Sequence, residues 1–324
     1  MTYDDMVLND RELLEVFDAA GECGALVMVH CEGYDAIRFM TEKLEKSGRL
    51  APYYHAVSRP QTVEREAAHR AISHSELTGV PIMIVHVSGG EAVEQIRWAR
   101  NKGLRVYAET CTQYVSLTAD DLKGLNMDDS GGKYVCSPPP RDHASWDAIW
   151  NGIQTGVFQT FSSDHCPFFF EGELGKKNPK ARTSFRWVPN GIPGVEVRMP
   201  ILYSEGVVKG RITVNEFVAL TSTNHAKMYG LYPEKGSIAP GFDADIVLWD
   251  PERQVTISQD LMHHGADYTP WEGFAVKGWP VMTLLRGRVA MKDGEVMAAA
   301  GDGKFLPRAL SSAAATRAAG ALMD

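Results

Sequence analysis

Four short apolar runs, each ending in residues capable of chemistry, constrain the fold of this chain most strongly. They are "ALVMVH" (25–30), "VPIMIVH" (80–86), "LRVYAET" (104–110) and "VFQTFSSDH" (157–165). Helix-like segments with apolar side chains every three or four residues separate these runs. Continuous apolar strands that alternate with helices are typical of a parallel sheet with helical cover. We therefore predict an α/β chain built on a β/α barrel over residues 1–232.

The helix before the first run carries a start signal of its own. Asn9 can cap a helix over residues 9–24, with Glu12 three positions later as its capping-box partner. Gly21 or Gly24 can end it. The other predicted helices cover residues 62–79, 89–103 and 145–156.

The pattern changes after about Gly230, where short β-prone runs alternate with Gly, Pro and Asp turns. The runs are "GSIAPGFDADIVLWDP" (236–251), "QVTISQ" (254–259) and "VMTLLRGRVAMKDGEV" (281–296). We expect a small β-sandwich module over residues 233–308. The Ala-rich tail, residues 309–324, is either a terminal helix or disordered.

Composition excludes several classes of function. The formal charge is -8 and no basic stripe is present, which argues against a nucleic-acid partner. The five cysteines are scattered, as in a reducing cytoplasm. The polar start "MTYDDMVLND" is no signal peptide, and no apolar run is long enough to cross a membrane. We expect a cytoplasmic protein.

Polar side chains at the strand ends form the candidate site. His30, His86 and Asp164 follow three of the apolar runs, and active sites of β/α barrels lie at the carboxyl ends of the strands. Two imidazoles and one carboxylate suit a divalent metal such as zinc. The alternative is that each histidine only caps its strand through a backbone hydrogen bond. The presence of three candidate ligands at strand ends favours a metal site over strand capping.

Two rigid loops are candidates for ligand binding. "CSPPPRD" (136–142) could present the backbone of Ser137, or it could be a plain loop. "VPNGIPGVE" (188–196) is rich in Gly and Pro in the same way. Cys166 is a poor nucleophile candidate, because only His165 beside it could act as a base. The remaining histidines are interpreted as structural or exposed: His55, His69, His74, His143, His165, His225, His263 and His264.

Several long motifs, in order along the chain, resemble the dihydropyrimidinases and D-hydantoinases, cyclic amidohydrolases of the urease-related superfamily. The motifs are "MVHCE", "IVHVS", "KYVCSPPPRD", "SSDHCPF", "VPNGIPGVE", "GLYPEKGSIAPGFDADIVLWDP" and "DYTPWEG". The resemblance covers the chain to about Arg308. It implies the C-terminal part of a TIM-like (β/α)8 hydrolase barrel, together with a β-sandwich.

The resemblance also implies roles for individual residues. His30 and His86 match ligands of one metal, and Asp164 matches the carboxylate that binds the other metal and moves protons. Tyr3 matches the residue that polarises the substrate carbonyl, and Ser137 and Asn190 match those whose backbone groups hold the cyclic amide. The family site holds two divalent ions, usually zinc, and family members are commonly homotetramers. The implied reaction opens dihydropyrimidines or 5-substituted hydantoins to N-carbamoyl amino acids.

The chain departs from the family pattern in one block. The family supplies two further ligands as H-x-H and a carboxylated bridging lysine upstream of a stretch like "FMTYDD", whereas this chain has no H-x-H and begins at "MTYDD". We therefore expect a fragment of a longer protein that leaves "ALVMVH" as an exposed apolar edge. We expect such a chain to bind at most one metal weakly and to turn over poorly.

Two other functions remain open. A non-catalytic relative that assembles with partners is one, although His30, His86 and Asp164 are all retained. Another cyclic amidohydrolase, such as an allantoinase or dihydroorotase, is the second. "SPPPRD" and "PNGIPGVE" favour a dihydropyrimidinase or hydantoinase over the latter.

Overall fold

The computed structural model describes residues 6–314 and contains two four-stranded sheets. The helices are α1 (Asp10–Cys23), α2 (Tyr34–Lys46), α3 (Tyr53–Ser58), α4 (Gln61–Thr78), α5 (Gly90–Asn101), α6 (His143–Gln154), α7 (Arg198–Leu202), α8 (Val214–Val218) and α9 (Asn224–Met228). The strands are β1 (Val27–Val29), β2 (Ile82–Ile84), β3 (Val106–Cys111), β4 (Thr160–Ser162), β5 (Ile246–Thr256), β6 (Ala275–Leu285), β7 (Arg288–Lys292) and β8 (Glu295–Val296). Tyr3 lies outside the described residues.

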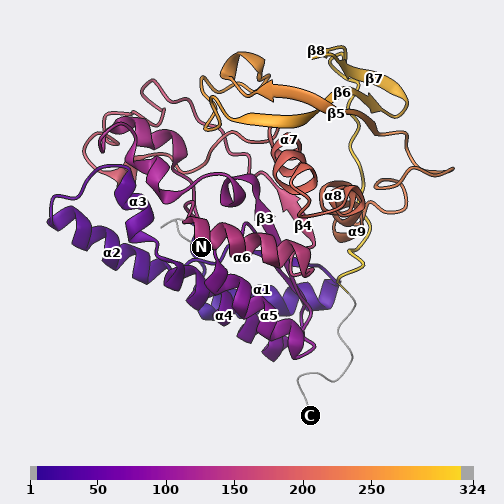
Figure 1. Ribbon diagram of the computed structural model, residues 1–324. Helices are drawn as coiled ribbons and strands as arrows, with labels where there is room; N and C mark the ends of the chain where they lie inside the picture. Colours follow the sequence, from indigo (N-terminus) through magenta and orange to yellow (C-terminus); the bar gives the residue numbers. More distant parts are fainter. Residues whose placement is uncertain (1–5, 315–324) are drawn as a thin grey trace.

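The first sheet is parallel, with strand order β1-β2-β3-β4, as in a β/α barrel. Helices α1, α4, α5 and α6 lie side by side against one face of it (Figure 1). The second sheet is antiparallel, with order β5-β6-β7-β8, and packs over α7 (Figure 1). The predicted fold class is confirmed. The domain limits at residues 232 and 308 stay a prediction.

Helix α1 begins and ends with the capping box and the glycine predicted from the sequence. The side chain of Asn9 accepts a hydrogen bond from the Glu12 amide at 3.0 Å, and the Asn9 amide donates one to Oε2 of Glu12 at 2.8 Å. Gly24 ends the helix with φ 71°, in the left-handed region that glycine adopts without steric cost. Phe17 and Ala20 face the core.

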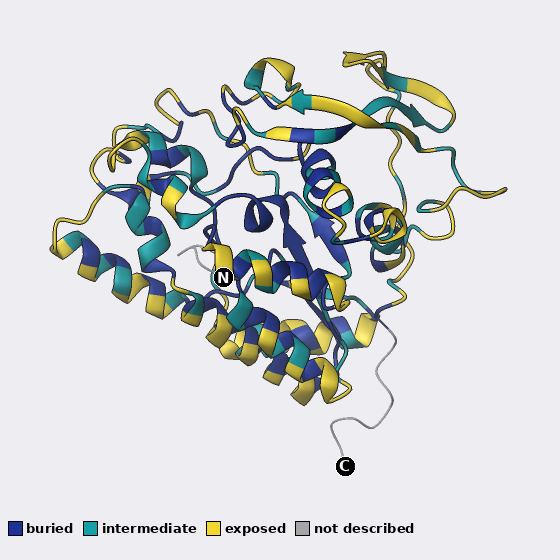
Figure 2. Cartoon of the chain, in the orientation of Figure 1, coloured by how far each residue is buried: buried dark blue, intermediate teal, exposed yellow. Residues whose placement is uncertain are grey.

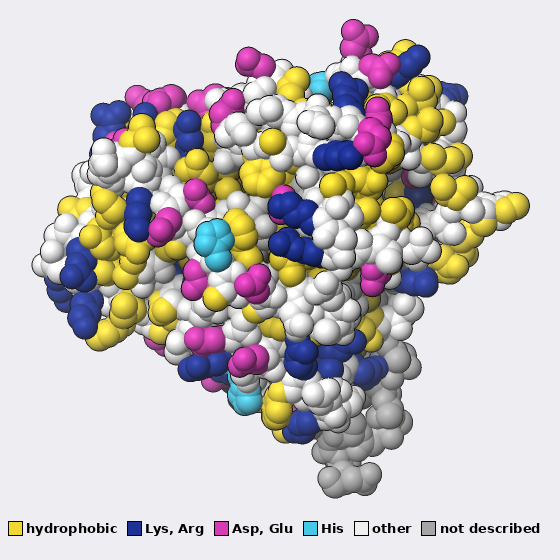
Figure 3. Space-filling model, viewed as in Figure 1, with side chains coloured by type: hydrophobic (Ala, Val, Ile, Leu, Met, Phe, Trp, Pro, Cys, Tyr) yellow, Lys and Arg dark blue, Asp and Glu magenta, His cyan; other side chains and the backbone are white. Residues whose placement is uncertain are grey.

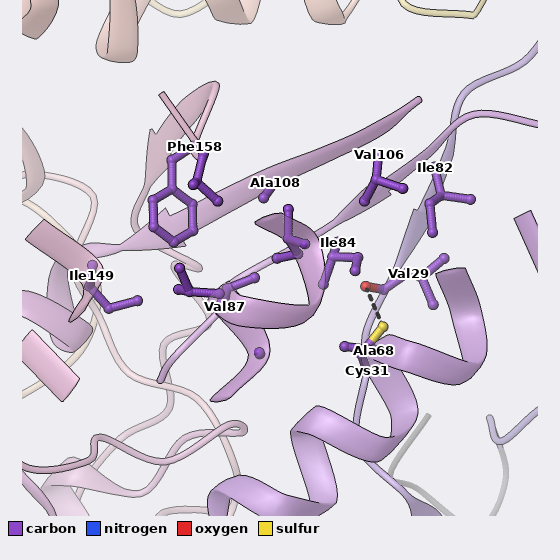
Figure 4. Packing of buried hydrophobic residues seen from close by; sticks show 14 of the residues in the cluster. Val29, Cys31, Ala68, Ile82, Ile84, Val87, Val106, Ala108, Ile149 and Phe158 are labelled. Carbon is purple, nitrogen blue, oxygen red and sulfur yellow. Dashed lines mark hydrogen bonds between the residues drawn. The ribbon is translucent and has the colours of Figure 1, made fainter. Parts of the chain in front are cut away.

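The main core lies between the parallel sheet and its helices. Ile82 and Ile84 are fully buried, and each contributes roughly 1.5–3 kcal/mol through burial of its side chain. Figure 4 shows them with Val106 and Ala108 of β3, packed toward Ala68 of α4. Figure 2 shows that the covering helices keep their outer faces exposed.

Burial differs between the first two strands. All three residues of β2 are buried, as predicted for an inner strand, but Met28 in β1 is 48% exposed. The apolar run at residues 25–30 is therefore only partly covered. Among residues 6–314, β1 is an edge strand with β2 as its neighbour, in agreement with the exposed apolar edge expected from the sequence.

The antiparallel sheet has longer strands than the sequence indicated. "QVTISQ" is not a separate strand, because residues 254–256 continue β5 after a shift in register. The carboxylate of Asp250 accepts hydrogen bonds from the amides of Glu252 and Arg253 at 3.0 and 3.2 Å, which satisfies these groups at the irregularity. The tail has no helix over residues 309–314; the rest of it lies outside the described residues.

Within residues 6–314, no helix is long and apolar enough to cross a bilayer. On the face shown in Figure 3, Lys and Arg side chains are interspersed with Asp and Glu.

Candidate active site at the ends of the parallel strands

Two predicted ligands meet at the carboxyl ends of β1 and β2. Nδ1 of His30 lies 2.8 Å from Nε2 of His86, and the two rings meet edge to face at 71°. His86 is buried, which lowers the pKa of its imidazole to about 3. His86 is therefore neutral near pH 7, the form that binds metals.

A carboxylate behind His30 determines which ring nitrogen carries the proton. Nε2 of His30 lies 3.1 Å from Oε2 of Glu32, which is buried. Burial opposes ionisation of Glu32, but the hydrogen bond and charge of His30, together with Arg59, outweigh it and lower the pKa to about 2. In the neutral form of His30 the ionised carboxylate accepts the Nε2 proton, so Nδ1 accepts the hydrogen bond that Nε2 of His86 donates. Carboxylate–histidine pairs of this kind orient imidazoles that bind metals.

Asp164 follows β4 by two residues on the same rim. Burial raises the pKa of its carboxyl, and the charge of His30 opposes that rise. Asp164 and His86 both have positive φ, 46° and 43°. Residues other than glycine rarely adopt positive φ, and such backbone strain is commonly found at functional sites.

The two imidazoles fit a divalent ion in donor type, and an ion bound between them would replace their mutual hydrogen bond. Nδ1 of His86 is buried and has no hydrogen-bond partner among residues 6–314. Across the same described range, no three side chains of the His, Cys, Asp and Glu types converge closely enough to hold a metal. The structure thus brings His30 and His86 together, but it does not complete a three-ligand cluster with Asp164.

Two of the predicted substrate-binding residues, Ser137 and Asn190, lie together. Oγ of Ser137 donates to Oδ1 of Asn190 at 3.2 Å, although 53 positions separate them in the chain. The structure places His55 beside them, with Nε2 2.9 Å from the Cys136 carbonyl oxygen and 3.4 Å from the Ser137 hydroxyl. These contacts agree with a structural role for His55, but the sequence did not indicate that it lies beside Ser137. Its sequence context carries no signal that would have revealed it.

A buried ion pair supports the "CSPPPRD" loop. Nη2 of Arg141 lies 3.1 Å from Oε2 of Glu64, and its Nε donates to the Ser88 hydroxyl at 2.9 Å. Arg141 also donates to the carbonyl oxygen of Arg59. Burial raises the pKa of Glu64, while Arg141 and Ser88 oppose that rise. The arginine of "CSPPPRD" therefore anchors this loop to Glu64 of α4.

The remaining candidates are structural. Nδ1 of His165 accepts hydrogen bonds from the amides of Gly194 and Val195 at 3.0 and 3.3 Å, so His165 holds a loop. Burial raises the pKa of the Cys166 thiol, which disfavours the thiolate that a nucleophile requires. Nε2 of His225 lies 3.1 Å from the Phe161 carbonyl oxygen.

The model of the amidohydrolase family matches residues 1–290, and the chain belongs to this family. Its relatives include the D-hydantoinase of Ralstonia pickettii, 46% identical over 95% of this chain and 66% of that protein. The D-phenylhydantoinase of Escherichia coli strain K12 / DH10B is 41% identical, over 93% of this chain and 64% of that one.

Solved structures agree with these relatives. A D-hydantoinase superimposes with a TM-score of 0.91 at 46% identity, over 95% of this chain and 66% of its own. The dihydropyrimidinase of Brevibacillus agri NCHU1002 superimposes with a TM-score of 0.92 at 42% identity, over 96% of this chain and 67% of its own. The chain spans about two thirds of the length of the relatives it matches.

Proposed function

We propose that this chain belongs to a metal-dependent cyclic amidohydrolase of the hydantoinase and dihydropyrimidinase type. The proposed reaction opens 5-substituted hydantoins or 5,6-dihydropyrimidines to N-carbamoyl amino acids. One observation carries the proposal: the His30 and His86 nitrogens face one another 2.8 Å apart at the carboxyl ends of two neighbouring strands, in a chain 46% identical to a D-hydantoinase.

The residues present would hold part of a metal site. His30 and His86 would supply neutral imidazole nitrogens, and Asp164 a carboxylate, for a divalent ion that we propose to be zinc. Lewis-acid activation of water and of the ring carbonyl is the chemistry that such an ion supplies.

The protein's own groups would position the substrate and move its protons. Asp164 is suited to proton transfer because partial burial raises the pKa of its carboxyl above the ordinary value. It would take the proton of the attacking water and return it to the leaving ring nitrogen. Backbone groups of Ser137 and Asn190 would hold the ring amide. Tyr3, outside the described residues, would donate to the developing oxyanion.

Assembly and location are part of the same proposal. We propose a cytoplasmic homotetramer. Its substrate is a small cyclic ureide or amide, and it takes part in pyrimidine degradation.

Parallel assays of the zinc-loaded chain on dihydrouracil, 5-phenylhydantoin and allantoin test the function. We expect slow hydrolysis of one of the first two, and a further loss of at least about 100-fold in Asp164→Asn, because general acid–base groups contribute about that much. His143→Asn is the matched control, since His143 is exposed on α6.

Turnover of allantoin alone would support an allantoinase instead. Bound zinc with no turnover of any substrate would support a non-catalytic assembly protein. Full activity of Asp164→Asn would show that Asp164 has a different role.

A further inference from the structure

Three buried side chains each donate a hydrogen bond to a backbone carbonyl of residues 135–138. The bonds run from Lys176 to Val135 at 2.7 Å, from His55 to Cys136 at 2.9 Å and from Tyr114 to Pro138 at 2.8 Å. The donors come from distant parts of the chain. Within residues 6–314, no hydrogen bond reaches the remaining carbonyl of this segment, that of Ser137.

The hydrogen bonds of His55 require one tautomer. Nη1 of Arg59 lies 3.3 Å from Nδ1 of His55, and a guanidinium can only donate, so Nδ1 is the acceptor. The ring proton must then lie on Nε2, where it is donated to the Cys136 carbonyl. Burial and the charge of Arg59 lower the pKa of His55 well below its usual value, so the ring stays neutral.

Arg59 connects this arrangement to the metal-ligand candidates. Its Nε lies 3.8 Å from Oε2 of Glu32, the same oxygen that lies 3.1 Å from His30. The side chains of Glu32, Arg59 and His55 thus form a continuous buried chain from His30 to the Cys136 carbonyl.

Lys176 joins the two loops that carry Ser137 and Asn190. Its Nζ donates to the carbonyl of Val135 at 2.7 Å and to that of Pro189 at 3.0 Å. The amide of Gly191 also donates to Val135, at 3.1 Å. An amine and an ammonium both carry at least two N–H donors, so either form of Lys176 can make both bonds.

We propose that His55 and Lys176 are positioning residues that hold residues 135–138 and 189–191 in place, and so fix the Ser137 backbone that the proposed function assigns to the ring amide. The ligand class, a cyclic imide or ureide, is that of the proposed function. The identity of the ligand rests on the proposed function, whereas the positioning role does not.

Amide hydrogen exchange, followed by mass spectrometry, tests the positioning role directly. In His55→Leu and Lys176→Met we expect exchange over residues 134–137 and 189–192 to accelerate at least about tenfold, because each variant removes buried donors. His55→Gln keeps a terminal N–H donor and should restore slow exchange. The matched controls are His143→Leu and Lys180→Met, at exposed positions.

Imidazole ¹⁵N spectra of the unmodified chain test the same inference without a destabilising change. We expect His55 to carry its proton on Nε2, with no titration from pH 5.5 to 8, and His55→Gln to assign its signals. A proton on Nδ1, or an imidazole that titrates in this range, would overturn the inference. So would unchanged exchange in both variants, or equal acceleration in His55→Gln and His55→Leu.

Kinetics separate this inference from the proposed function. If 5-phenylhydantoin is a substrate, His55→Leu and Lys176→Met should raise KM about tenfold and leave zinc content unchanged, with kcat within about twofold. A fall in kcat at constant KM would contradict substrate positioning. If the unmodified chain hydrolyses none of the substrates, the proposed function fails. The amide hydrogen-exchange rates of the variants and the tautomer of His55 still test the positioning role in that case.

Discussion

Nδ1 of His30 lies 2.8 Å from Nε2 of His86, at the ends of two neighbouring parallel strands. Glu32 contacts the opposite ring nitrogen of His30, at 3.1 Å. This contact places the proton of His30 away from His86. Nδ1 of His30 therefore accepts the hydrogen bond from Nε2 of His86. The two imidazoles meet at one rim position, where a bound ion would replace this hydrogen bond, and this makes the pair a candidate metal site.

The first prediction concerns this pair and its carboxylate. We expect His30→Ala and His86→Ala each to abolish the zinc binding of the chain, and Glu32→Gln to weaken it about 10–100-fold, because loss of a carboxylate behind a ligand has that effect. Competition with a chromophoric chelator measures the affinity. His74→Ala, remote from the strand ends in α4, serves as the control. Equal zinc affinity in all these variants would place the metal elsewhere.

The second prediction concerns the buried ion pair of Glu64 and Arg141. We expect Glu64→Leu to lower the free energy of unfolding by about 3–5 kcal/mol, because the Arg141 guanidinium would stay buried without its carboxylate. Urea denaturation measures the change. The double variant with Arg141→Leu should lose less than the sum of the two single losses.

A surface ion pair provides the contrast. Glu76 and Lys102 are 2.7 Å apart but well exposed, so Glu76→Ala should cost less than about 1 kcal/mol. A similar cost for Glu64→Leu and Glu76→Ala would mean that burial of the Glu64–Arg141 pair has little energetic consequence.

The third prediction concerns pH and Lys176. Burial lowers the pKa of this lysine to about 7, against an ordinary value of 10.5. Between these two values the unfolded chain binds the proton and the folded chain does not, so this group favours unfolding there. Its contribution therefore makes stability rise with pH from about 7 to 10.5, with no further change below 7, where both states are protonated.

Urea denaturation across this pH range tests the sign. Lys176→Met should remove part of the positive slope of the unfolding free energy against pH, whereas Lys180→Met, at an exposed position, should leave it unchanged. If the unfolding free energy has the same slope against pH in the unmodified chain and in Lys176→Met, the buried lysine keeps an ordinary pKa.

Local patterns in the sequence predicted a large part of the fold. The Asn9–Glu12 capping box and the Gly24 stop depend on neighbours within one or two helical turns. The same holds for the alternation of helices with apolar strands. The polar residues that follow the strands also identified His30 and His86 correctly as neighbours, because parallel strands bring their carboxyl ends to one edge. The helix α2 and the full length of β5 were missed.

The sequence by itself determined the strand and helix pattern, the candidate ligands and the resemblance to cyclic amidohydrolases. Only the tertiary structure decided which buried polar groups pair. His55 meets Cys136 across 81 positions, and Lys176 meets Val135 across 41. No periodicity or spacing encodes such contacts. They exist because a buried donor must find an acceptor once folding has removed water, and which acceptor it finds depends on how the whole chain packs.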